Sequence, residues 1–244
     1  MNKTYAFSDV HGVYDLWAQI RDYCDETDTI YFLGDANDRG PDGVRIIAEL
    51  LKDKRVIYLK GNHEDMLTIC VPEFIEGHFA NQCWWYMNGG MKTWKTLNQL
   101  SEESQLYFVR KLNNLPKSAW YASPKGHKVF LTHAGTDLRY TEQELITMGR
   151  GCKDPYIWDR KHFFAPRPQG FNNVYQVHGH TPVVKLRKEY KFFEPNTPIV
   201  LEVFNYCEGH KIDIDMSSFA SGITALIDLD TFNVKYFQTK EGLE

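Results

Sequence analysis

The chain has 244 residues and a formal net charge of −4, and 43% of its residues are hydrophobic while 25% are charged. These proportions are typical of a soluble globular protein and exclude a chain that is mainly disordered. The acidic balance and the absence of a long Lys/Arg run argue against a nucleic acid polymer as a partner.

No stretch approaches about 18 consecutive apolar residues, so we expect no membrane-spanning helix. The N-terminus has no apolar signal region. The five cysteines are scattered and form no C-x-x-C pair, which is typical of reduced thiols. We therefore expect a cytoplasmic protein that does not associate with membranes.

The first third of the chain alternates short strand-like and helix-like segments. Strands are predicted at Thr4–Phe7, Thr29–Leu33 and Arg55–Leu59, which are short, rich in β-branched or aromatic residues, and end in turn-forming residues. Apolar residues at helical spacing predict helices at Asp15–Tyr23 and Gly43–Leu51. This alternation predicts an α/β fold in which crossovers join parallel strands.

The middle segment, Glu64–Leu115, is predicted to be mostly helical. Ser101 followed by two glutamates marks a helix start, and Pro116 marks the end of that helix. The segment contains three tryptophans, Trp84, Trp85 and Trp94. For these side chains we favour packing in a helical core over direct binding of a substrate.

The rest of the chain contains further strand-like runs, which lie close together in sequence and suggest antiparallel pairing. They are Val129–Leu131, Val174–Val177, Ile199–Phe204, Lys211–Asp215, Ile223–Leu229 and Val234–Phe237. We find no repeat and no long linker, and predict a single domain over residues 1–244, with 64–128 as a helical insertion within it.

Five polar clusters follow predicted strands, where ligands collect in open α/β sheets. They are Ser8-Asp9-Val10-His11-Gly12, Gly34-Asp35-Ala36-Asn37-Asp38-Arg39-Gly40, Gly61-Asn62-His63-Glu64, Thr132-His133-Ala134-Gly135 and His178-Gly179-His180-Thr181. Their Asp, Asn and His side chains form a mixed oxygen and nitrogen ligand set, which suits Mn, Fe, Zn or Ni.

The spacing of these residues suits two metals better than one. Asp9 and His11, two residues apart, could bind one ion from the end of a single strand. Asn62 and His133 come from other strands, and the two carboxylate oxygens of Asp35 could bridge both ions. Paired metals about 3.5–4 Å apart are the usual means of hydrolysing phosphate esters.

The ordered set of clusters resembles the motif series of the calcineurin-like metallophosphoesterases, and in detail the phosphoprotein phosphatases of bacterial and phage (lambda phosphatase-like) type. The family pattern is G-D-x-H-G, G-D-x-x-D-R-G and G-N-H-E, followed by two histidines. This sequence matches the second and third motifs in full and departs from the first only at Ser8. Asn88-Gly89-Gly90 followed by Thr93 also resembles the bacterial branch. The resemblance extends from Asp9 to Asp215 and implies a layered sandwich of mixed sheets flanked by helices.

The resemblance also implies a metal centre of two divalent ions, and we expect Mn²⁺ before Fe, Zn or Ni. One ion would be bound by Asp9 and His11, and Asp35 would bridge to the other. The second ion would be completed by Asn62, His133 and His180.

The catalytic roles likewise follow from the resemblance. His63 would be the general acid for the leaving group, and Asp38 would orient it by a hydrogen bond. Arg39 and Arg160 would bind the phosphate oxygens. A metal-bridging hydroxide would attack phosphorus in line, without a phosphoenzyme.

Some residues depart from the family pattern or stand outside these roles. Ser8, Asn37 and Met216-Ser217 replace the usual residues of their motifs, which leaves substrate preference and pH optimum open. For His178 we favour a packing or supporting role. The remaining histidines are expected at the surface or in loops, and these are His78, His127, His162 and His210.

Three functions remain open at this stage. The first is a serine/threonine phosphoprotein phosphatase, whose partner would be a phosphoprotein or phosphopeptide, with small phosphoesters as further substrates. The second is a hydrolase of dinucleoside polyphosphates, because a related branch keeps the same metal motifs. The third is an inactive scaffold of the same fold, which the complete set of ligand residues disfavours.

Overall fold

The strands of the computed structural model lie in two five-stranded sheets. The structure describes residues 2–147, 154–160 and 164–240. The strands are β1 (Thr4–Phe7), β2 (Thr29–Phe32), β3 (Val56–Tyr58), β4 (Ser118–Ala122), β5 (Lys128–Thr132), β6 (Val174–His178), β7 (Phe204–Tyr206), β8 (Lys211–Asp213), β9 (Ile223–Asp228) and β10 (Val234–Gln238). The strand order is β10-β9-β1-β2-β3 in the first sheet and β4-β5-β6-β8-β7 in the second.

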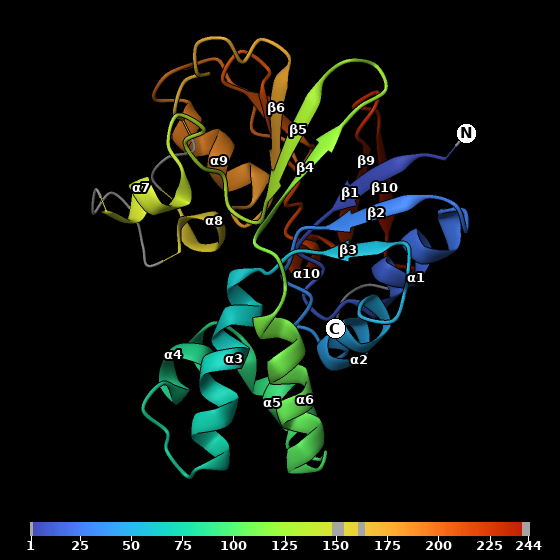
Figure 1. Cartoon of the computed structure of the whole chain (residues 1–244), viewed down its shortest axis with the longest axis vertical. Helices are drawn as coiled ribbons and strands as arrows, with labels where there is room; N and C mark the ends of the chain where they lie inside the picture. The colour runs from blue at the N-terminus through green and yellow to red at the C-terminus, as the bar shows by residue number, and fades with distance from the viewer. Residues whose placement is uncertain (1, 148–153, 161–163, 241–244) are drawn as a thin grey trace.

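Helices cover the outer faces of both sheets (Figure 1). They are α1 (Tyr14–Tyr23), α2 (Gly43–Leu50), α3 (Asn62–Ile75), α4 (Gln82–Met87), α5 (Gly90–Leu97), α6 (Glu102–Asn113), α7 (Glu142–Thr147), α8 (Pro155–Trp158), α9 (Val183–Tyr190) and α10 (Ser218–Ser221). Helices α1 and α2 lie beside the first sheet, α9 lies beside the second, and α3 to α6 form a group below the sheets (Figure 1). The predicted α/β class, with mixed sheets flanked by helices, is confirmed.

Successive side chains along the strands of the first sheet point to opposite faces, and both faces are apolar, so the sheet lies between two apolar layers. Phe7 and Phe32 point into a cluster with α1, α2 and the helices of the middle segment. Ala6 and Leu33, their neighbours in sequence, point to the opposite face, against residues of the second sheet such as Leu131. Strands β1, β2 and β3 are parallel, as predicted.

The second sheet differs from the prediction in three respects, of which the first is that it contains β4, a strand that was not predicted. Strand β5 pairs in parallel with β6, and β6 with β8, so the expected antiparallel pairing is wrong for these strands. Helix α9, which was not predicted, carries the chain back between β6 and β8 and makes the parallel pairing possible. The strand expected at Ile199–Phe204 is also wrong, because β7 begins only at Phe204.

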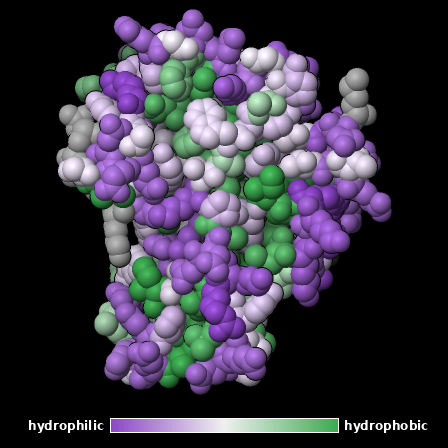
Figure 2. Space-filling model, viewed as in Figure 1, coloured by the Kyte–Doolittle hydropathy of each residue, from purple (hydrophilic) through white to green (hydrophobic). Residues whose placement is uncertain are grey.

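The middle segment is helical from α3 to α6, and β4 then joins the second sheet. The Ser101 side chain accepts a hydrogen bond from Ser104 N (3.3 Å) at the start of α6, as its cap position predicts. Hydrophobic side chains gather on this helical part in the view of Figure 2. The assignment of the whole chain to one domain, with 64–128 as an insertion, stays a prediction.

The carboxyl ends of β1, β2, β5 and β6 meet where the two sheets and the start of α3 converge, and the motif clusters follow these strand ends. Within the described residues, no helix is both long and apolar enough to cross a membrane.

Candidate metal centre

The loops after β1 and β2 lie against each other and share an unusual backbone. Asp9, His11, Asp35, Asp38 and Arg39 all have positive φ, between 42° and 69°, a conformation that is costly for residues other than glycine. Backbone hydrogen bonds join the loops, among them Asp9 N to Gly34 O (3.0 Å) and His11 N to Asp35 O (3.0 Å). These bonds hold the strained residues with their side chains directed to one place.

Glu64 stabilises the same loops from the first turn of α3. Its carboxylate accepts hydrogen bonds from the backbone N–H groups of Asp35 (2.9 Å), Ala36 (2.7 Å) and Gly61 (2.8 Å). No role was predicted for Glu64 from the sequence. Its position three residues after Gly61, where a glutamate often reaches back to the start of a helix, could have indicated one.

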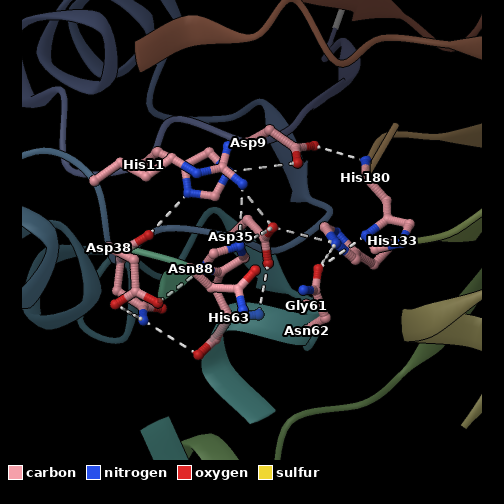
Figure 3. Close-up of polar contacts among 12 residues, drawn as sticks. Asp9, His11, Asp35, Asp38, Gly61, Asn62, His63, Asn88, His133 and His180 are labelled. Carbon is pink, nitrogen blue, oxygen red and sulfur yellow. Dashed lines mark hydrogen bonds and ion pairs between the residues drawn. The ribbon is translucent and has the colours of Figure 1, made fainter. Parts of the chain in front are cut away.

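The first group of candidate ligands surrounds Asp35. The Nε2 atom of His11 lies 3.6 Å from Asp35 Oδ2 and 3.9 Å from Asp9 Oδ1 (Figure 3). His11 Nδ1 lies 2.9 Å from the carbonyl oxygen of Asn37, so it donates there and leaves the Nε2 lone pair directed at the carboxylates.

The second group lies on the other side of Asp35. His133 Nε2 is 3.4 Å from Asp35 Oδ2 and 2.9 Å from Asn62 Oδ1. His180 Nδ1 is also 2.9 Å from Asn62 Oδ1, and its buried Nε2 has no hydrogen-bond partner among the described residues. Two groups of side chains around Asp35 could each hold a metal ion. Asp35 forms one group with His11 and His63 and the other with His133 and His180, and within each group the ligand atoms lie within 4.8 Å of one another. The residues therefore fit two cations joined by one carboxylate.

The electrostatics of the site also favour bound cations. Burial raises the pKa of the Asp35 carboxyl, but His133 and His63 outweigh burial and hold that pKa well below its usual range. Burial would lower the pKa of His133, yet the Asp35 carboxylate beside it raises that pKa to about 9. A buried histidine with a raised pKa marks a place where positive charge is stabilised. Burial lowers the pKa of His11 and His180 well below the ordinary value, which keeps them neutral, as metal ligands must be.

Asp38 is buried and holds His63 by a hydrogen bond of 2.7 Å to Nδ1. Trp85 Nε1 donates to the same Asp38 oxygen at 2.9 Å, and Thr93 Oγ1 donates to the other at 2.7 Å. Asn37 Nδ2 also donates to that second oxygen at 2.8 Å, so the amide does not compete with His63. Sequence reasoning missed the roles of Trp85 and Thr93, because only the packing of α4 and α5 brings them to Asp38.

The two arginines predicted to bind phosphate are held differently. Arg39 Nη2 lies 3.2 Å from His63 Nε2, and the Arg39 N–H donates to Gly89 O at 3.0 Å. Arg160 is exposed, and its guanidinium donates to Thr181 Oγ1 at 3.0 Å and to His180 O at 3.3 Å. Both guanidinium groups thus contact residues of the metal centre, Arg39 from the loop after β2 and Arg160 from the segment after α8.

Ser8 and Gly179 link the two sheets at Asp9. The Ser8 hydroxyl donates to Asp9 Oδ2, and His180 N donates to the same oxygen at 3.1 Å. A Cβ atom at Gly179 would collide with both Asp9 Oδ2 and Ser8 Oγ. The serine that departs from the family motif therefore orients Asp9, with Oδ1 left toward His11.

Two further histidines lie away from the candidate ligands. His178 is buried, and its Nε2 lies 2.7 Å from the Tyr206 hydroxyl, in agreement with the expected supporting role. His210 lies in the turn between β7 and β8, so its expected place in a loop is correct, but its side chain is buried, with 1% exposed. His162 lies outside the described residues.

Comparison with known proteins relates this arrangement to one family. The sequence profile of the calcineurin-like phosphoesterases matches residues 3–214. A bis(5'-nucleosyl)-tetraphosphatase PrpE [asymmetrical] of Halalkalibacterium halodurans is 26% identical over 212 residues, which is 73% of this chain and 78% of that protein. The protein of the same name from Oceanobacillus iheyensis is 32% identical over 178 residues, which is 65% of this chain and 64% of that protein.

Solved structures with low sequence identity share the fold. A putative diadenosine tetraphosphatase superposes with a TM-score of 0.59 at 14% identity, covering 99% of this chain and 95% of that one. A protein serine/threonine phosphatase from Saccharomyces cerevisiae superposes with a TM-score of 0.56 at 12% identity, covering 99% and 81%. At these identities the likeness is one of fold alone.

Proposed function

This chain belongs to the calcineurin-like phosphoesterase family, and we propose that it uses two divalent cations to hydrolyse phosphoester or phosphoanhydride bonds. The observation that carries the proposal is the position of Asp35, whose carboxylate belongs to both sets of ligand atoms. The proposed ligands are Asp9, His11, Asp35, Asn62, His133 and His180.

The cations would activate water as the nucleophile and neutralise charge on the phosphoryl group. The chain supplies further positive charge through Arg39 and Arg160, whose planar guanidinium groups suit two oxygens of one phosphate. Arg39 donates to His63 and Arg160 donates to Thr181, and a phosphate group can take the place of either acceptor.

His63 would protonate the leaving group. Arginine has only donors, so in this structure Arg39 donates to His63 Nε2, and His63 Nδ1–H donates to Asp38. When Arg39 turns to the phosphate, Nε2 becomes free to take up a proton from water and deliver it to the departing oxygen. Asp38, fixed by Trp85 and Thr93, keeps the ring in place during this change.

For the substrate we propose a dinucleoside tetraphosphate. The Asn88-Gly89-Gly90 turn, which pointed to a phosphoprotein phosphatase, has structural reasons that do not depend on the substrate. A Cβ atom at Gly89 would lie 2.8 Å from Arg39 Cγ, and one at Gly90 would collide with the Trp85 indole. The names of the two PrpE relatives then favour the dinucleotide. The motif series keeps a serine/threonine phosphoprotein phosphatase as the second candidate.

The test is hydrolysis by metal-stripped protein reloaded with Mn²⁺, with diadenosine tetraphosphate and a phosphoserine/phosphothreonine protein as parallel substrates. We expect faster turnover of the dinucleotide, with AMP and ATP as products if cleavage is asymmetrical. Preference for the phosphoprotein would overturn the proposed substrate and support the second candidate. Inactivity on both substrates and on p-nitrophenyl phosphate would overturn the proposed hydrolase.

A further inference from the structure

Two tryptophans from distant parts of the chain stack on each other beside the metal centre. Trp84 lies on α4 and Trp158 at the end of α8, and their ring centroids are 5.7 Å apart with planes inclined by 26°. Trp84 remains 37% exposed, so the stack buries only part of its surface. An indole that only packed a helical core would be expected to be buried, as Trp85 is on the same helix.

Trp158 is fixed close to the catalytic residues. Its Nε1 donates to Asp65 Oδ2 at 3.1 Å, and Asp65 lies on the first turn of α3, two residues after His63. The other Asp65 oxygen accepts from Lys60 Nζ at 2.8 Å, which holds the carboxylate in place. Arg160 follows Trp158 by two residues, so this indole is tied both to the helix of His63 and to a proposed phosphate-binding arginine.

Trp84 is connected to the other arginine. The Asn88 side chain donates to Trp84 O at 2.8 Å, and the adjacent Gly89 O accepts from Arg39 N at 3.0 Å. Figure 3 shows Asn88 among the residues of the metal centre. Met87, the last residue of α4, comes directly before this turn, and it is 88% exposed. The exposed side chains of Trp84 and Met87 therefore lie on the helix that leads into the turn contacting Arg39.

We infer that the Trp84–Trp158 pair is a stacking platform for a purine base of a dinucleoside polyphosphate whose phosphates bind Arg39 and Arg160. The inference rests on the proposed function and names the residues that would recognise the nucleoside part of the substrate. Every base offers a flat π-face, and stacking on exposed aromatic side chains is a usual way of binding unpaired bases. The expected packing in a helical core remains correct for Trp85, whereas for Trp84 we now propose binding of the base.

The test compares Trp84→Leu, Trp84→Tyr and the matched control Trp120→Leu. Trp120 is also exposed and contacts another ring, that of Phe130, but it lies on β4 at the edge of the second sheet. For diadenosine tetraphosphate, Trp84→Leu should lower kcat/KM about 5- to 100-fold, mainly through KM, as loss of one base–aromatic stack implies. Trp84→Tyr should recover most of this loss, and Trp120→Leu should change little.

The second substrate, p-nitrophenyl phosphate, separates base binding from structural damage. Its turnover should stay within about twofold in Trp84→Leu. Equal losses on both substrates, or no loss on the dinucleotide, would overturn the platform. If the wild-type protein does not cleave the dinucleotide, the proposed substrate fails separately. AMP quenching of tryptophan fluorescence that disappears in Trp84→Leu would then still support a base site, and no quenching would refute it.

Discussion

The two sheets contribute to the metal centre with different backbone conformations. In the loops after β1 and β2, five proposed site residues adopt the left-handed conformation. In the segments after β5 and β6, His180 adopts it and His133 does not. The first loops are fastened to each other by backbone hydrogen bonds and to α3 by Glu64. The later segments meet them through side chains and through the contact of Gly179 with Asp9. The first sheet thus supplies a rigid frame for catalysis, and the second sheet completes the ligand set.

Replacement of Asp35, the carboxylate shared by both sets of ligands, should give the largest loss of activity. Asp35→Asn removes a negative charge from both sets of ligands, so both cations should bind weakly and kcat should fall by about 10³-fold or more. Metal content after dialysis, measured with activity, checks the prediction. Normal binding of two metals would exclude a bridging role for Asp35.

A change at His63, which is not one of the six proposed ligands, should affect the chemistry alone. His63→Asn should lower kcat by roughly 10²–10⁴-fold, the range expected for lost general acid catalysis. Metal content should remain near that of the wild type. Nearly unchanged activity would show that another group donates the proton.

Trp85→Phe tests how far the frame depends on the buried hydrogen bond to Asp38. The change keeps an aromatic ring in the core but removes the donor that lies 2.9 Å from Asp38 Oδ2, so kcat should fall by about tenfold. The pH profile of kcat should also move, because Asp38 orients His63. Trp94→Phe is the control, since Trp94 packs against the same cluster. Equal effects of the two changes would point to packing alone.

The last effect is on stability rather than on rate and concerns His210, whose backbone oxygen accepts a hydrogen bond from Gln176 N of β6. Burial lowers the pKa of His210 from 6.5 to about 4, so the folded protein keeps the ring neutral while the unfolded chain takes up a proton near pH 6.5. Its contribution to stability is therefore complete above about pH 6.5 and is lost as the pH falls toward 4.

Urea unfolding measured at several pH values checks this prediction. The wild type should lose about 3 kcal/mol more unfolding free energy across this range than His210→Leu, relative to each protein at pH 7. Parallel curves for the wild type and His210→Leu would show that other groups cause the acid sensitivity.

The sequence was most informative where local pattern decides structure. The strands of the first sheet were placed to within a residue or two, because turn-forming residues border each apolar run. Helix α9 was missed, since it begins with Val183 and Val184, and β-branched residues at that position equally suit a strand. Its buried Val183, Leu186 and Tyr190 follow helical spacing, but the run is short. Missing α9 led directly to the wrong pairing of β6 and β8.

For the site, the motif residues could be named from the sequence because each cluster is continuous in the chain. Trp85 and Thr93 could not, because they reach Asp38 across more than 45 residues through the packing of α4 and α5. Likewise, nothing local to Ser8 indicates that its hydroxyl orients Asp9, or that His180 N shares this oxygen.

The close approach at Gly179 places a constraint on how this protein can evolve. The absence of a side chain there lets the backbone before His180 rest on Ser8 and Asp9, which lie some 170 positions earlier in the chain. A mutation at any of the three forces compensation in a distant part of the gene. We therefore expect these positions to change together among descendants of this sequence, and recombination between its two halves to succeed only between parents that match at this junction.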